Sequence, residues 1–475
     1  MNKIDKSPPD LPLDLVARFA EIVGRTNALT DPQDLAPYLI EDRNLYHGRS
    51  SLVLRPGTTA EVAAICKLAN ATRTALVPQG GNTGLVGGQI AMNGEVVLSM
   101  RRLDKVRDID PQSNTMTVDA GVVLATAQQK AIAVDRLFPL ALGSEASCTI
   151  GGNLSTNAGG TSAMAFGVAR DLVLGLEVVL ADGRVLNGLS KLKKDNTGYD
   201  LRDLFIGAEG TLGVITAAVV KLFPRPRAVE TAFIGLNSPD DALKLLGLAQ
   251  ADALGSVTSF ELITGLAIDF YVRHIVGARD PLPARHPWYV LIELSSSTTH
   301  LRETIEGILS GALDAGLIND AVIAESLEHR QAFWRLRDSI TPSQKPEGGS
   351  VKHDVSVPVA AVPAFIAEAS EAVRKLIPGA RPFPFGHLGD GNIHFNISQP
   401  VGGDKDAFLA RWYEISDLVH GITRRYGGSI SAEHGIGVMK RDELPHVKDP
   451  VAMELMRTLK ATLDPHNILN PGKVL

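Results

Sequence analysis

Three clusters of glycine and small polar residues limit the folds that this chain can adopt. They occupy residues 79–88, residues 150–161, and residues 195–199 together with 203–215, and the first directly follows a short apolar run. Consecutive glycines expose backbone N–H groups with no Cβ in the way, so such loops form concave nests for phosphate oxygens. One cluster alone is typical of ordinary turns in a β-rich domain, whereas three in one stretch indicate an extended nucleotide-binding bed.

The first cluster does not match the common nucleotide-binding motifs. It lacks the Gly-x-Gly-x-x-Gly spacing, with a following helix and an acidic residue about twenty positions further on, that dinucleotide-binding folds use. It also lacks the Walker pattern of phosphate-binding loops. Neither a Rossmann domain nor a P-loop domain is therefore expected.

The segments around the clusters alternate between helical and strand patterns. Residues 13–23 have the apolar spacing of an amphipathic helix, which Gly24 ends. Residues 59–71 predict a helix with Thr59 at its cap and Glu61 in its first turn. Short strands are expected at residues 52–54, 75–78, 172–180 and 185–186, the last two joined by a hairpin turn at Asp182 and Gly183.

Composition narrows the functional classes. A chain of 475 residues has room for two or more domains with sizeable cores. The net charge of -6 and the lack of a basic stripe argue against nucleic acid as a partner. Cys66 and Cys148 are the only cysteines and lie among apolar or small residues, so a reducing compartment is expected rather than a disulfide framework.

Targeting and membrane segments are also not expected. No apolar run approaches the roughly 18 residues that a membrane span needs. Residues 1–12 contain two aspartates and three prolines and lack the apolar core of a signal peptide. The expected location is therefore the cytoplasm.

Residues near the C-terminus are suited to binding a metal ion. His387 and His394 are seven residues apart, which fits a short turn running into a strand at residues 392–397. Glu433, in the later segment SAEHGIG, would complete a set of two histidines and one carboxylate, and three protein ligands with open positions are how a catalytic metal is held. His434 is then a candidate general base. The alternative is that each histidine is a satisfied polar residue in a glycine-rich turn.

Four short segments carry a resemblance to a known superfamily. Residues 78–84, 150–153, 207–213 and 469–473 resemble the FAD-binding signatures of the vanillyl-alcohol oxidase and p-cresol methylhydroxylase (PCMH) flavoproteins, and the resemblance extends from about residue 45 to residue 475. The C-terminal motifs resemble the FAD-linked D-2-hydroxyacid dehydrogenase branch. Its D-2-hydroxyglutarate dehydrogenases are the most similar subgroup, on the basis of residues 83–88, 194–200 and 352–356.

The resemblance implies an α+β architecture, in which a two-lobed PCMH-type FAD-binding domain is joined to an α+β cap domain with an antiparallel sheet. The expected pattern of helix 301–316 and strand 288–294 agrees with such a cap. The expected parts are an N-terminal helical segment (1–44), the FAD-binding domain (45–226), the substrate or cap domain (227–425) and a C-terminal segment that returns to the FAD domain (426–475).

The resemblance also implies which residues bind FAD. No histidine is present in residues 78–88, where several superfamily members attach FAD covalently, and Cys148 is expected to be a packing residue rather than a second tether, so noncovalent FAD is expected. The implied FAD-binding residues are Pro78, Gly80, Gly81, Asn82, Thr83, Gly84, Leu85, Gly143, Ser144, Ser147, Ile150, Gly151, Gly152, Asn153, Ser155, Thr156, Asn157, Gly159, Gly160, Glu209, Gly210, Gly213, Ile215 and Asn470.

The implied chemistry is a metal-assisted hydride transfer. A divalent metal on His387, His394 and Glu433, with zinc expected and manganese or iron as alternatives, would lower the pKa of the substrate hydroxyl so that His434 can take its proton. The hydride would move from the α-carbon to the flavin, which supplies the redox chemistry. Asn396 and His434 match substrate contacts beside the metal.

A basic and polar group is implied to bind the substrate carboxylate. Arg337 and Thr341 lie four residues apart at the end of an expected helix, residues 328–340, so they share one face. Together with Lys352 they form a guanidinium, hydroxyl and ammonium set suited to a carboxylate. The alternative is a solvated helix on which Arg335, Arg337 and Asp338 form weak surface ion pairs.

The expected function is oxidation of a D-2-hydroxyacid to the 2-oxoacid, with D-2-hydroxyglutarate as substrate and 2-oxoglutarate as product. The alternatives are a D-lactate or other D-2-hydroxyacid dehydrogenase or oxidase, a non-catalytic FAD-binding subunit of a glycolate-oxidase-like complex, and a metal-dependent hydrolase without flavin. The expected partners are a small 2-hydroxyacid, a soluble electron acceptor such as electron-transfer flavoprotein, and a second copy of the chain in a homodimer.

Overall fold

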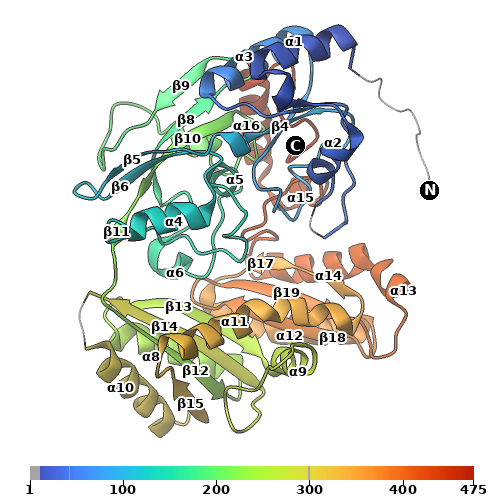
Figure 1. The fold of residues 1–475 in the computed structure, drawn as a ribbon. Helices are drawn as coiled ribbons and strands as arrows, with labels where there is room; N and C mark the ends of the chain where they lie inside the picture. The colour runs from blue at the N-terminus through green and yellow to red at the C-terminus, as the bar shows by residue number, and fades with distance from the viewer. Residues whose placement is uncertain (1–10, 42, 298–299) are drawn as a thin grey trace. The chain divides into compact units, whose positions relative to one another are not determined.

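The computed structural model describes residues 11–41, 43–297 and 300–475 (Figure 1). The chain forms two compact units. Unit 1 comprises Met1–Ala158, Val168–Pro224 and Glu433–Leu475, and unit 2 comprises Gly159–Gly167 and Arg225–Ala432. Both units combine helices with sheets, which confirms the predicted α+β class.

The first sheet of unit 1 has a parallel centre. Its strands follow the order β1 (Ala28–Leu29), β2 (Val53–Leu54), β4 (Val96–Ser99) and β3 (Leu76–Gln79), and β4 pairs in parallel with both β2 and β3. Helix α3 (Thr59–Thr72) connects β2 to β3 and packs with α1 (Leu13–Val23) in one hydrophobic core. The predicted β-α-β start of this region is therefore present, with β4 inserted between its two strands.

The N-terminal cap of α3 differs from the prediction by one residue. Thr58, rather than Thr59, has the extended conformation of a cap, and its hydroxyl accepts a hydrogen bond from the backbone N–H of Glu61. Thr59 is the first helical residue, and its hydroxyl donates to Glu177 at 2.7 Å. Two adjacent threonines fit the capping pattern equally well in sequence, and the structure selects the one whose side chain reaches the third residue of the helix.

The second sheet of unit 1 is antiparallel. Its order is β5 (Val106–Asp110), β6 (Thr115–Asp119), β10 (Val214–Lys221), β8 (Val173–Val179) and β9 (Val185–Gly188). The register that pairs Val179 with Val185 closes the β8–β9 hairpin where its turn was predicted. The C-terminal helices α15 (Leu444–Val447) and α16 (Pro450–Leu463) also belong to this unit. Past α16, Leu469 forms a parallel bridge to Leu76.

Unit 2 is built around one antiparallel sheet with helices on both faces (Figure 1). Successive residues of a strand point to opposite faces. Phe260 and Leu262 pack in the core with α8, α10, α12 and α14, whereas Ile263 packs in a second core with α9 and α11. The strand order is β15 (Asp320–Ile323), β12 (Ala228–Leu236), β14 (Trp288–Ser296), β13 (Val257–Thr264), β18 (Arg381–His387), β19 (Asn392–Ser398) and β16 (Ser350–Val351), with β17 (Asp354–Ser356) also paired to β19. Its longer helices are α8 (Pro239–Asp252), α9 (Gly265–His274), α10 (Leu301–Asp314), α11 (Leu327–Gln344), α12 (Val362–Leu376) and α14 (Trp412–Arg425), and α6 (Ala163–Phe166) and α13 (Lys405–Leu409) are short.

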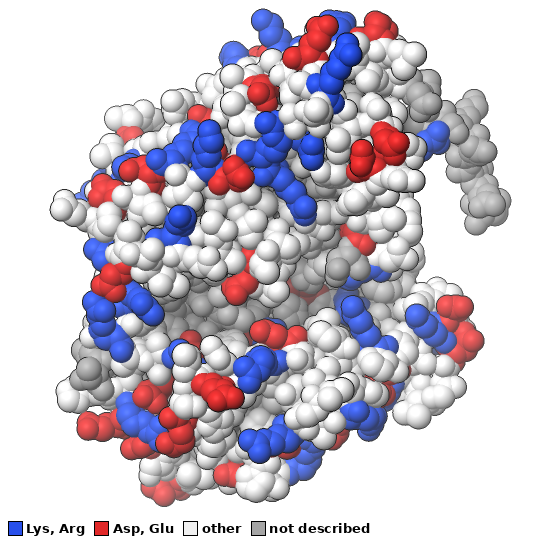
Figure 2. Space-filling view, in the orientation of Figure 1, with Lys and Arg blue, Asp and Glu red and all other residues white. Residues whose placement is uncertain are grey.

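Charged side chains of both signs are interspersed on the surface. On the face that Figure 2 views, Lys and Arg side chains alternate with Asp and Glu side chains over the described residues. Among the helices that the structure describes, none combines the length and the apolar character needed to cross a bilayer.

Candidate active site

Within unit 1, the first glycine cluster lies against the segment that leads into the second. A Cβ added to Gly80 would collide with the Thr149 hydroxyl, and one added to Gly81 would collide with the carbonyl oxygen of Ser147. These two positions of the loop after β3 therefore have no room for a side chain. The close approach brings the loop and the segment before α5 (Ile150–Ser155) into one surface.

The third cluster joins the other two through backbone hydrogen bonds. The N–H of Gly207 donates to Leu154 O at 2.9 Å, and the N–H of Glu209 donates to Ser155 O at 2.8 Å. Gly210 has a φ of +71°, and a Cβ there would lie 3.2 Å from Pro78 Cγ. The parts of the three clusters that belong to unit 1 thus form one continuous bed, although they lie far apart in the sequence.

Buried polar atoms in this bed fit a polar ligand such as FAD. Thr149 Oγ1, Asn153 Nδ2 and Asn470 Oδ1 are buried and have no hydrogen-bond partner among the described residues. Leaving a buried polar group unsatisfied costs about 1–3 kcal/mol, so such atoms are normally paired in a folded protein. A bound dinucleotide, with its many donors and acceptors, would supply these partners, and the crowded glycines would let it approach the backbone.

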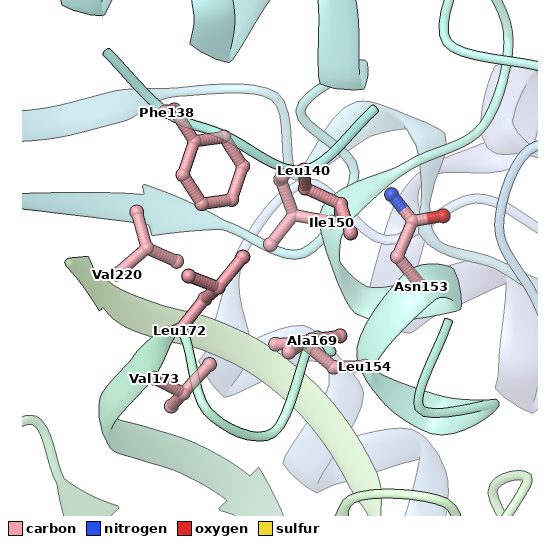
Figure 3. A pocket seen from close by; sticks show the side chains of 9 residues that line it. All are labelled: Phe138, Leu140, Ile150, Asn153, Leu154, Ala169, Leu172, Val173 and Val220. Atoms are coloured by element: carbon pink, nitrogen blue, oxygen red, sulfur yellow. The ribbon is translucent and has the colours of Figure 1, made fainter. Parts of the chain in front are cut away.

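A small apolar cavity lies beside α5, which contributes three of its lining residues (Figure 3). Asn153 is the one polar residue that lines it, and the others are Phe138, Leu140, Ile150, Leu154, Ala169, Leu172, Val173 and Val220. Its walls carry no charged side chain. The cavity is therefore suited to apolar packing rather than to binding phosphate.

Two of the predicted FAD-binding residues, Asn82 and Asn470, use their side-chain amides to hold the protein itself. The amide of Asn82 donates to Pro37 O at 3.1 Å and to Ile40 O at 2.9 Å. The amide of Asn470 donates to Gly88 O at 2.9 Å and to Glu209 O at 2.8 Å. These contacts join the first cluster to the N-terminal segment and to the C-terminal tail.

The Glu209 carboxylate is turned toward the C-terminal segment. It accepts hydrogen bonds from the backbone N–H of Ile436 at 2.7 Å and of Gly437 at 2.9 Å. Burial raises the pKa of this carboxyl above its usual value, although both N–H donors act in the opposite direction. Glu209 therefore anchors the segment in which His434 lies.

The other predicted FAD-binding residues divide between the two units. Gly159 and Gly160 belong to unit 2. Those of unit 1 lie in β3 and the loop after it, in the segment before α5, in α5 and the residues after it, and around the start of β10: Pro78, Gly80, Gly81, Thr83, Gly84, Leu85, Gly143, Ser144, Ser147, Ile150, Gly151, Gly152, Asn153, Ser155, Thr156, Asn157, Gly210, Gly213 and Ile215.

We expect FAD to leave the polypeptide on acid or heat precipitation. The loop at residues 78–88 offers no histidine for a covalent bond. The Cys148 thiol is 2% exposed, and burial raises its pKa, so it is held in its unreactive protonated form. The absorbance of the supernatant at the flavin bands measures the release. Flavin that stays with the precipitated polypeptide would contradict noncovalent binding.

A polar cluster lies on the face of the unit 2 sheet that α9 and α11 cover. Glu261 on β13 pairs across the strands with His387 on β18, and Oε1 of the carboxylate lies 2.5 Å from Nδ1 of the imidazole. Arg337 of α11 donates from Nε to Oε2 of the same carboxylate at 2.8 Å. Burial disfavours the charged form of Glu261, but the contacts with His387 and Arg337 outweigh it and lower the pKa of the carboxyl below its usual value.

The two predicted metal-binding histidines come together in unit 2, but not on one element. His387 ends β18 and His394 lies in β19, and the ring centroids are 5.5 Å apart. The predicted strand at residues 392–397 is present as β19, but His387 lies on the preceding strand, so the two histidines belong to the two strands of a hairpin, in whose turn Gly391 has a positive φ of 83°. Nδ1 of His394 lies 3.8 Å from the Asp354 carboxylate.

The predicted substrate residues of unit 2 lie around the same face. Asn396 lies in β19 two residues after His394 and pairs with Phe383 of β18. Its amide donates to Gln344 Oε1 at 3.0 Å. Thr341 lies in the last turns of α11, one turn after Arg337, and Lys352 lies between β16 and β17. The Arg337 side chain is only 12% exposed, so this residue is not part of a solvated helix face, whereas Arg335 is exposed.

Glu433 and His434 belong to unit 1, so the full set of predicted ligands and base combines residues of both units. Both residues are partly buried. A metal site made by His387, His394 and Glu433 with His434 as base therefore stays a prediction.

Sequence reasoning missed two residues of the polar cluster, Glu261 and Gln344. Glu261 is fully buried, and Gln344 is 1% exposed and donates to Ser398 at 2.8 Å while it holds Asn396. A glutamate between Phe260 and Leu262, in a strand with no other charged residue, is the available signal for the first. Gln344 follows Pro342, where a helix was not expected to continue, and no signal marked it.

Comparisons with known proteins agree with this geometry. Residues 225–474 match the family described as FAD linked oxidases, C-terminal domain, and residues 50–188 match the FAD binding domain family. A mitochondrial D-2-hydroxyglutarate dehydrogenase of Arabidopsis thaliana is 39% identical over 461 residues, covering 97% of this chain and 81% of the relative. A D-2-hydroxyglutarate–pyruvate transhydrogenase of Saccharomyces cerevisiae is 36% identical, covering 100% of this chain and 97% of the relative. A structure of p-cresol methylhydroxylase with substrate bound has the same fold, with a TM-score of 0.78 at 17% identity over 97% of this chain and 96% of that one.

Proposed function

The chain belongs to the FAD-linked D-2-hydroxyacid dehydrogenases of the vanillyl-alcohol oxidase and p-cresol methylhydroxylase superfamily, and we propose that it oxidises D-2-hydroxyglutarate to 2-oxoglutarate. Relatives whose names state an activity on this substrate align with almost the whole chain. The observation that carries the proposal is the polar cluster of unit 2, in which one buried carboxylate holds both Arg337 and His387.

The substrate's distal carboxylate is assigned to Arg337, Thr341 and Lys352. An arginine offers five N–H donors in a planar fork, and the Nε–H of Arg337 is used by Glu261, so its terminal nitrogens are the ones that would bind an anion. The guanidinium carbon lies 5.6 Å from the centre of the Phe385 ring, which fixes the plane of the fork. D-2-Hydroxyglutarate has this second carboxylate and D-lactate does not.

His387, His394 and Glu433 would hold a divalent metal, with zinc as the first candidate. Imidazole and carboxylate ligands are of the kind that zinc, manganese and iron accept. When bound, such an ion lowers the pKa of a coordinated hydroxyl. The Glu261 carboxylate at Nδ1 of His387 agrees with a metal site, because metal-binding histidines usually donate their second N–H to such a group.

His434 is assigned the role of general base and Asn396 that of a substrate contact. The side-chain NH₂ group of Asn396 donates a hydrogen bond to Gln344. This bond fixes the orientation of the amide, so that the side-chain oxygen of Asn396 can accept from another donor. As a neutral imidazole, His434 would take the hydroxyl proton as general base. FAD, noncovalently bound in the glycine bed, supplies the hydride acceptor.

We further propose that the protein passes its electrons to a soluble protein acceptor such as electron-transfer flavoprotein. We also propose that it forms a homodimer and that it is located in the cytoplasm. The yeast relative is named for transfer to pyruvate, so a 2-oxoacid is a second candidate acceptor. The Arabidopsis relative is named mitochondrial, and fractionation of the source cells with compartment markers would decide between the two locations.

A dye-reduction panel of D- and L-2-hydroxyacids, with and without chelator, tests the proposed function. The highest kcat/KM is expected for D-2-hydroxyglutarate, with no turnover of the L enantiomer and loss of activity in chelator. Better turnover of D-lactate would replace the proposed substrate with the shorter acid. No reduction by any hydroxyacid, in a protein that contains FAD, would favour the non-catalytic subunit.

A further inference from the structure

Glu261 is the most deeply buried charged residue of the polar cluster, and each of its two carboxylate oxygens has a different cationic or polar partner. Oε1 lies 2.5 Å from Nδ1 of His387, and Oε2 accepts from Nε of Arg337 at 2.8 Å. The Glu261 side chain is 1% exposed. A carboxylate removed from water in this way costs several kcal/mol unless it is paired and hydrogen-bonded, so both partners are needed to keep it there.

We infer that Glu261 is a positioning residue that links metal binding to recognition of the substrate's distal carboxylate. This inference rests on the proposed function for the roles of His387 and Arg337. The cross-strand register places Glu261 directly opposite His387, so the contact is set by the β13–β18 ladder and not by a mobile side chain alone. The second contact extends from the sheet to α11, which carries Arg337.

The bond to His387 has a defined chemical consequence. A carboxylate only accepts, so Nδ1 of His387 carries the proton in this bond. In a neutral imidazole Nε2 then presents a lone pair, which is the form that binds a metal ion. Glu261 thereby selects the metal-binding tautomer of His387.

The bond to Arg337 has a matching consequence for the substrate. Held by Nε, the guanidinium can rotate little, because Phe385 lies along its face. Its terminal N–H groups are then presented in one fixed direction. Because the same carboxylate holds the ligand histidine, the distance between the metal and the carboxylate-binding fork is set by one side chain, and that distance selects the length of the diacid.

Replacing Glu261 with glutamine tests the link, because an amide can accept from only one of the two partners. If the amide oxygen faces Arg337, the NH₂ group donates to Nδ1 of His387 and favours the tautomer with a protonated Nε2. If the amide oxygen faces His387 instead, the NH₂ group lies opposite the Nε–H of Arg337, and two donors cannot form a hydrogen bond. The measurements are zinc affinity by competition with a chromophoric chelator, and KM for D-2-hydroxyglutarate and for D-lactate at saturating zinc.

E261Q is expected to lower zinc affinity about 10- to 100-fold, which is the usual effect of removing the hydrogen-bond partner of a metal-binding histidine. It should also raise KM for D-2-hydroxyglutarate more than for D-lactate. R337A should raise that KM and leave zinc affinity within about threefold, and H387A should remove zinc binding. A residue that contacts both His387 and Arg337 is expected to change both the zinc affinity and the KM for D-2-hydroxyglutarate at saturating zinc.

E293Q is the matched control, because Glu293 lies on the same face and accepts from Thr231 at 3.0 Å and from Trp334 of α11 at 2.8 Å. E293Q should change neither the zinc affinity nor the KM for D-2-hydroxyglutarate.

If E261Q does not fold, the double variant E261L/R337M removes both buried charges together and should still lose zinc affinity. Unchanged zinc affinity in either Glu261 variant would overturn the inference. If the unmodified protein does not oxidise D-2-hydroxyglutarate, the zinc measurement still stands, so failure of the proposed function is distinguished from failure of this one.

Discussion

Replacing any one of His387, His394 and Glu433 is expected to abolish turnover while the flavin absorbance spectrum stays nearly unchanged. The three residues are the predicted metal ligands, and loss of a Lewis acid worth several kcal/mol corresponds to about a thousandfold or more in rate. The FAD bed is formed by other residues, at the loop after β3, α5 and the start of β10. H387A, H394A and E433Q should therefore be yellow, inactive proteins, as should the unmodified protein after chelation.

Steady-state dye reduction and metal analysis of each variant measure this prediction. H300A and E303Q are the controls, because their side chains are 79% and 82% exposed and lie in unit 2 away from the polar cluster. Both controls should keep full activity. Loss of FAD together with activity in all three ligand variants would mean that these residues have a structural role.

Replacing Arg337 with alanine is expected to raise the KM for D-2-hydroxyglutarate about tenfold or more and to affect D-lactate far less. A charge-assisted hydrogen bond contributes on the order of 1.5–3 kcal/mol, and about 1.4 kcal/mol corresponds to a factor of ten. Only the longer diacid has the carboxylate that this arginine is assigned to bind. Michaelis constants for both acids, measured at saturating metal, give the comparison.

Arg335 supplies the control for this variant, since it is exposed two residues earlier on the same helix. R335A should leave both Michaelis constants unchanged. Equal losses on both substrates in R337A would show that Arg337 holds the α-carboxylate that the two acids share, and the basis for a preference for the diacid would be lost.

The elements with local signals were predictable from the sequence. Gly24 ends α1 where the apolar spacing ends, and the turn at Asp182 and Gly183 joins β8 to β9. Each of these features is set by a few adjacent residues, such as a glycine with positive φ, and adjacent residues are what a sequence displays. The family resemblance extended this to the fold class, which the structural comparison confirms.

The elements that depend on distant partners were not predictable. The helix expected to end at Ile340 continues through Pro342 to Gln344, and this last turn places Gln344 against Asn396. Glu261 became part of the cluster only because the β13–β18 register sets it opposite His387, 126 positions along the chain. Pairing between strands so far apart is decided by the packing of the whole sheet, and no local pattern reports it.

Anaerobic addition of D-2-hydroxyglutarate to the purified protein tests the central claim most directly. Two electrons from the substrate should bleach the flavin absorbance, with one equivalent of 2-oxoglutarate formed for each flavin reduced. The same addition after chelation should leave the flavin oxidised. A flavin that stays oxidised with D-2-hydroxyglutarate in the presence of metal, but is bleached by D-lactate, would contradict the account.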